Sequence, residues 1–169
     1  MSCIEIVLIG QASKIDLFII KSLMEKFILL AVFGIAMAHL EGVVVVYLRK
    51  IFGIENSQTN NDLLKKFSKQ YIFIEQTREV ATIVMLVVLA VMLGTTWLDR
   101  IIVFLWTFAF WDLFYYLSLY ILIKWPPKLT TIDVLFLIPR PWIAPVWVPI
   151  GISSITIITI IILHLTSIL

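Results

Sequence analysis

The sequence predicts an all-α fold, a polytopic transmembrane helical bundle of about four spans with a short proline-rich re-entrant or broken element. The chain has 169 residues, of which 62% are hydrophobic and only 14% charged, more apolar than a soluble core can hide. Four apolar stretches approach or exceed the roughly 20 residues that a helix needs to cross a bilayer. Ionisable residues lie within these stretches, which indicates a polar interior.

The first predicted span is Phe27–Leu48, and Arg49 and Lys50 end it. Residues 1–23 form an amphipathic leader, which we interpret as an interfacial helix or as an early extension of the span. A cleaved signal peptide is disfavoured, because the apolar run continues through residues 43–48 instead of stopping.

A polar segment over residues 51–77 is predicted to be a cytoplasmic loop with a surface helix, because turn-forming residues precede basic and apolar residues at helical spacing. The second span is predicted at Glu79–Leu98 and the third at Ile101–Ile123. Only Asp99 and Arg100 separate them, so we expect a tight antiparallel hairpin of helices.

The stretch Thr131–Ile138 is apolar but too short to span a membrane, and four prolines follow it before residue 150. Such an element is tolerated at membrane depth only when it is buried in protein or lines a cavity. The final span is predicted at Ala144–Leu165. The 169 residues therefore form one integral membrane domain.

The distribution of Lys and Arg predicts the orientation in the cell (inner) membrane. Of the 13 Lys and Arg residues, nine lie in residues 49–78 and 124–140, and four lie on the opposite side. Because Lys and Arg accumulate in cytoplasmic loops, both of these loops are predicted to be cytoplasmic and both termini outside.

Four carboxylates fall in the inner half of the predicted bundle or near its centre. They are Glu41, Glu79, Asp112 and Asp133. With this topology and a rise of about 1.5 Å per residue, their depths are compatible with one cavity that opens towards the cytoplasm.

Glu75, Arg78, Glu79 and Thr82 follow the helical spacing i, i+3, i+4, i+7 and share one helix face. Arg78 is able to pair with either glutamate or with a carboxylate on another helix. The group is compatible with an interfacial ion-pair cluster that caps the helix. It is equally compatible with a bound cation, a phosphate-bearing headgroup or a proton path.

The third span is rich in aromatic residues, and Asp112, Tyr115 and Tyr116 share one of its faces. A tyrosine hydroxyl that donates to an intramembrane carboxylate lowers the cost of burying it. An Asp–Tyr clamp between helices is one interpretation. A wall for a quinone or a lipid is the other.

His39 is a weak candidate for a metal ligand, because Glu41 lies about 200° away around the helix. His164 is predicted near the outer end of its span, too far from His39 to share a haem. The sequence indicates no particular metal or cofactor. It contains no P-loop, GxSxG, HExxH or CxxC pattern, which favours a non-enzymatic protein.

Five strings in this order resemble a family of small uncharacterised prokaryotic integral membrane proteins, over about residues 40–150. They are LEGVVVVYLR (40–49), EQTREVAT (75–82), FWDLFYY (110–116), WPPKL (125–129) and DVLFLIPRPW (133–142). The family pattern passes through five of the ionisable candidates and has no histidine at position 39. The resemblance implies no activity and transfers no catalytic role.

The leading functional hypothesis is a buried polar cavity that binds a small ligand, ion or lipid. One alternative is a structural or accessory subunit, whose charges would pair with other membrane subunits. Another is a membrane-embedded lipid-modifying enzyme. The lipid bilayer is the expected partner, and the small net charge of +2 disfavours nucleic acid. A concave site favours binding or catalysis, whereas carboxylates on a flat outer surface favour a subunit.

Overall fold

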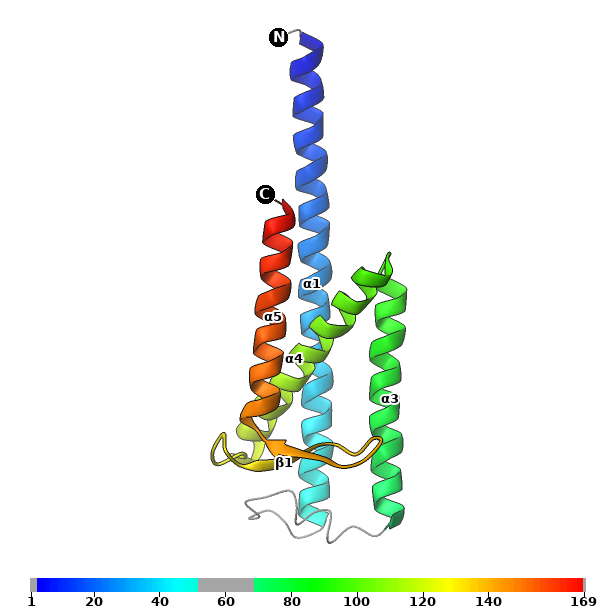
Figure 1. The fold of residues 1–169 in the computed structure, drawn as a ribbon, viewed down its shortest axis with the longest axis vertical. Helices are drawn as coiled ribbons and strands as arrows, with labels where there is room; N and C mark the ends of the chain where they lie inside the picture. Colours follow the sequence, from blue (N-terminus) through cyan, green and yellow to red (C-terminus); the bar gives the residue numbers. More distant parts are fainter. Residues whose placement is uncertain (1–2, 52–68, 169) are drawn as a thin grey trace.

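The computed structural model describes residues 3–51 and 69–168 and confirms the predicted transmembrane helical fold. Four helices make up most of it, α1 (Cys3–Ile51), α3 (Lys69–Leu93), α4 (Trp97–Ile123) and α5 (Trp147–Ile168) (Figure 1). Each contains a segment that is long and apolar enough to cross a membrane. These segments are Lys21–Ile51, Tyr71–Leu93, Trp97–Ile123 and Trp147–Thr166. The fold is that of a multi-pass membrane protein.

The first two helices are longer than the spans predicted from sequence. Helix α1 is continuous from Cys3, so the stretch before the first span extends the same helix, one of the two forms considered above. Helix α3 begins at Lys69, so residues 69–77 of the segment predicted as a loop with a surface helix are continuous with the second span. The earlier part of that segment, residues 52–68, lies outside the described residues.

The turn between α3 and α4 lies at residues 94–96, and the predicted break at Asp99 and Arg100 is wrong. Thr96 caps α4 by accepting a hydrogen bond from the Asp99 backbone N–H at 3.1 Å. The Asp99 carboxylate in turn accepts from the Thr95 N–H at 2.9 Å and pairs with Lys26 of α1. Because Asp99 satisfies backbone groups at the helix N-terminus, it starts the helix where we expected it to interrupt one.

The proline-rich element is a two-stranded antiparallel hairpin, a form that we did not predict. Strand β1 (Ile132–Phe136) pairs with β2 (Trp142–Pro145), and the register shifts between Val134 and Phe136. The hairpin crosses the end of the bundle at which α1 ends and α3 begins (Figure 1). It therefore lies over the helix ends that carry most of the candidate residues.

Helix α4 is the central helix of the bundle, because it packs against α1, α3 and α5. It crosses obliquely between them (Figure 1). Its contact with α1 is close because small residues of α1 face it. A Cβ on Gly34 would lie 2.9 Å from the backbone oxygen of Thr107, and a Cβ on Gly42 would lie 3.0 Å from the Cβ of Ser118. Ala38, one turn from each, is fully buried.

Candidate functional site

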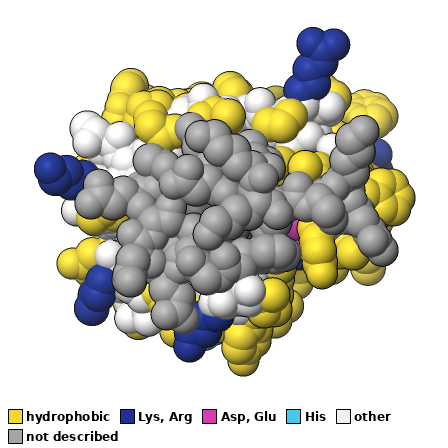
Figure 2. All heavy atoms as spheres, turned by 90° about the horizontal axis from the view of Figure 1, so that it is seen from below, with side chains coloured by type: hydrophobic (Ala, Val, Ile, Leu, Met, Phe, Trp, Pro, Cys, Tyr) yellow, Lys and Arg dark blue, Asp and Glu magenta, His cyan; other side chains and the backbone are white. Residues whose placement is uncertain are grey.

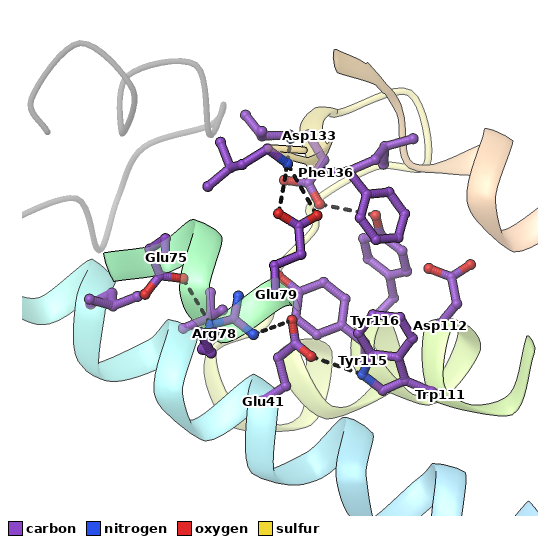
Figure 3. A pocket seen from close by; sticks show the side chains of 15 residues that line it. Glu41, Glu75, Arg78, Glu79, Trp111, Asp112, Tyr115, Tyr116, Asp133 and Phe136 are labelled. Carbon is purple, nitrogen blue, oxygen red and sulfur yellow. Dashed lines mark hydrogen bonds and ion pairs between the residues drawn. The ribbon is translucent and has the colours of Figure 1, made fainter. Parts of the chain in front are cut away.

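A cavity of about 110 Å³ lies at the hairpin end of the bundle, between α1, α3, α4 and β1 (Figure 3). The structure places every candidate ligand-binding residue from the sequence on its lining. These residues are Glu41, Glu75, Arg78, Glu79, Asp112, Tyr115, Tyr116 and Asp133. Side chains separated by up to 92 positions in the sequence, from Glu41 to Asp133, thus meet in one concave site.

Arg78 joins α3 to α1 through its guanidinium. Its Nη1 lies 2.8 Å from Oε1 of Glu41, and its Nε donates to Oε2 of Glu75 at 2.9 Å. The other oxygen of Glu41 accepts a 2.9 Å hydrogen bond from Nε1 of Trp111 on α4. One guanidinium therefore serves two carboxylates, and Glu41 connects three helices at the cavity wall (Figure 3).

Glu79 joins α3 to the hairpin. Both of its carboxylate oxygens accept from the backbone N–H of Leu137, at 3.1 and 3.0 Å. Gln76, one turn earlier, donates to the backbone oxygen of Leu137 at 3.2 Å. Leu137 follows β1 directly, so these contacts compensate backbone groups that the two-stranded hairpin leaves unpaired, and they hold the hairpin against the cavity.

The tyrosine of the predicted Asp–Tyr clamp binds a different carboxylate from the one expected. Tyr116 donates to Oδ2 of Asp133 at 3.0 Å, which connects α4 to β1. Asp112 instead accepts from the hydroxyl of Ser153 on α5 at 2.7 Å. The reason is the hairpin, which brings Asp133 over the end of α4, whereas α5 packs beside Asp112.

Aromatic side chains form much of the remaining wall. Trp111 and Phe136 contact each other edge to face, with ring centroids 6.4 Å apart, and Tyr115 and Tyr116 do so at 5.1 Å. Phe136 comes from β1, and its role depends on the hairpin. Sequence reasoning listed neither Trp111 nor Phe136 as a site residue, since an aromatic residue by itself is more often packing than a ligand contact.

Arg49 lies in the last turn of α1, where the first span was predicted to end. Its side chain is buried, with 1% of its surface exposed. Its guanidinium carbon lies 4.9 Å from the centre of the Trp125 ring. An arginine in this position stabilises the packing below the hairpin by a cation–π contact.

His39 lies on an exposed face of α1, outside the cavity lining. His164 lies against Phe27, with ring centroids 4.7 Å apart, and does not approach the site. Within residues 3–51 and 69–168, no group of three His, Cys, Asp or Glu side chains is arranged to hold a metal ion.

Hydrophobic side chains surround the molecule when it is viewed from the hairpin end, and Lys and Arg side chains project at several points around them (Figure 2). This pattern is typical of the end of a membrane protein at the lipid–water boundary.

Comparisons of the chain with models of protein families, with curated proteins and with solved structures find no match.

Proposed function

We propose that this multi-pass membrane protein binds a small ligand in the cavity beneath the hairpin. The observation that carries the proposal is the gathering of five carboxyl groups and one guanidinium on a single concave surface. They come from three helices and the hairpin, within segments that are otherwise apolar. A charge at membrane depth costs about 2.5–3.5 kcal/mol on insertion scales, so such a concentration supports a functional site.

The shape of the site supports ligand binding over the role of an accessory subunit. A subunit would present its carboxylates on an outer surface for a partner helix, whereas here they face inwards. A lipid-modifying enzyme would need a concave site too. However, the described part of the chain contributes no serine, cysteine or histidine to the lining, so the lining holds no Ser–His or Cys–His nucleophile pair.

Native mass spectrometry of the protein, extracted gently from its own membrane, is expected to show a single chain that carries a bound small molecule. Asp112→Asn and Glu41→Gln are expected to lose that molecule, because both change the polar wall of the cavity. Asp99→Asn is the matched control, since Asp99 lies at the other end of α4. A partner of defined stoichiometry with no small molecule would instead support the subunit role.

We propose further that the cavity end of the bundle faces the cytoplasm and that both termini lie outside. Alkaline phosphatase, which folds only outside the cytoplasm, is therefore expected to be active when fused after Leu169 and inactive when inserted after Ser57. Green fluorescent protein at the same two positions is the reciprocal control. Activity of the insertion together with an inactive terminal fusion would reverse the orientation.

A further inference from the structure

The cavity lining carries more carboxyl groups than its cation can compensate. Arg78, the single cation that the described chain contributes to the lining, is shared by Glu41 and Glu75. Among the described residues, neither Glu79 nor Asp112 has a Lys, Arg or His nitrogen within 4.0 Å. Carboxylates that are removed from water without a counterion are costly to keep charged, so a cationic ligand would stabilise this arrangement.

One of these carboxylates retains a free acceptor atom. Asp112 uses Oδ2 to accept from Ser153, and its Oδ1 has no hydrogen-bond partner in the described part of the chain. The Tyr115 hydroxyl on the same lining also has none there. Both atoms can accept hydrogen bonds, so a ligand with N–H groups would supply the donors that these two oxygens lack.

Aromatic rings complement a positive charge on the same ligand. The rings of Phe136, Tyr115 and Tyr116 line the same cavity as the carboxyl groups of Glu79 and Asp112 (Figure 3). A cation near an aromatic face is attracted by the ring quadrupole, and the attraction is larger where water is excluded. An ammonium group can donate hydrogen bonds to the carboxyl oxygens and also lie against the aromatic rings. A metal ion would instead need oxygen ligands where the rings lie.

The volume limits the ligand to a small group. The cavity holds about 110 Å³, less than the roughly 150 Å³ of an engineered cavity that binds benzene. It has room for an ammonium and a few attached atoms, and any acyl chain or larger body must lie outside it. This size and the free acceptor on Asp112 favour a primary ammonium over a bulkier quaternary one, which has no N–H donor.

Resting on the function proposed above, we propose that the ligand presents a primary ammonium group to Glu79 and Asp112. The group is carried either by a phosphatidylethanolamine headgroup or by a free water-soluble amine. In both cases the nitrogen donates to Oδ1 of Asp112 and lies against the rings, Glu79 adds a second negative charge to the same lining, and the rest of the molecule extends out of the cavity.

The test uses the full chain in two arms. In the first, the protein is reconstituted into vesicles of equal phosphatidylethanolamine, phosphatidylcholine and phosphatidylglycerol, and native mass spectrometry identifies the lipid retained. In the second, the protein in discs of phosphatidylcholine alone is titrated calorimetrically with ethanolamine, and with choline as the control without N–H donors. Retained phosphatidylethanolamine assigns the headgroup as the source, and ethanolamine binding assigns a free amine.

Asp112→Asn and Glu79→Gln are expected to weaken the observed binding by about 30-fold or more, as when one partner of a buried charge pair is removed. Each amide oxygen still accepts the hydrogen bond from Ser153 or Leu137, so either variant can report if the other fails to fold. Asp99→Asn is expected to bind like the wild type.

Equal binding of choline and ethanolamine, or equal retention of phosphatidylcholine and phosphatidylethanolamine, would overturn the ammonium assignment. A different small molecule in the native spectrum, lost in Asp112→Asn, would overturn it as well but would leave the proposed binding function standing. A chain that carries nothing from its own membrane and binds neither amine nor lipid would remove both proposals.

Discussion

Replacement of Arg78 by methionine is expected to destabilise the folded protein by about 3 kcal/mol, the lower end of the range for breaking a buried ion pair. Arg78 compensates both Glu41 and Glu75, and methionine keeps an unbranched apolar stem without the charge. The variant therefore leaves two carboxylates without a counterion and also detaches α3 from α1. Unfolding in mixed detergent micelles, followed by circular dichroism, measures the change.

Lys128→Met is the matched control, because Lys128 is an exposed cation near the same end of the bundle and only its backbone N–H and C=O groups bond to Thr131. It is expected to change the free energy of unfolding by less than about 0.5 kcal/mol, as is usual for surface sites. A double-mutant cycle of Arg78→Met with Glu41→Gln should show that the losses are not additive. Equal stability of Arg78→Met and Lys128→Met would contradict the bridging role of Arg78.

Replacement of Gly34 by alanine is expected to cost about 1–3 kcal/mol, because the added Cβ has no space between α1 and α4. It would lie 2.9 Å from the backbone oxygen of Thr107 and 3.3 Å from the backbone nitrogen of Trp111. Backbone atoms cannot rotate away as side-chain ends do, so the helices must separate. The same unfolding measurement in detergent detects the loss.

Gly151→Ala is the matched control, since a Cβ at Gly151 on α5 meets no atom within 4 Å. The propensity of alanine for helices is expected to stabilise this variant by roughly 0.4–1 kcal/mol. If both glycine variants gain stability, that result would contradict the close contact of α1 and α4 at Gly34. Separation of these helices would also move Glu41 away from Trp111, so Gly34→Ala is expected to weaken ligand retention as well.

The positions of the carboxylates could be anticipated because depth follows from simple geometry. A helix rises by a constant amount per residue, and successive spans cross the membrane in opposite directions, so the helix ends that share a side follow from the order of the spans. Glu41, Glu79 and Asp112 were therefore expected in the inner half of the bundle or near its centre, on separate helices, and they line one cavity. The pairing of Arg78 with Glu75 also follows from helical spacing, since i and i+3 positions share a face.

Two local sequence patterns indicate structural features that the predictions above do not include. Thr96 and Asp99 have the spacing of a capping box, which would have moved the start of α4 before the charged pair. Gly34, Ala38 and Gly42 recur every four residues, a small-residue pattern typical of close helix packing in membranes. Both signals are short, and an apolar background of 62% hydrophobic residues obscures them.

The sequence by itself determined four helices that are long and apolar enough to span a membrane and the end of the bundle at which the candidate carboxyl groups gather, because hydrophobicity and helical rise are local properties of the chain. The tertiary structure alone decided which groups meet. Asp133 binds Tyr116, Asp112 binds Ser153, and Glu79 binds the backbone of Leu137. These pairings depend on the hairpin and on the packing of α5, and such long-range contacts are set by the whole fold, where each buried polar group must find a partner.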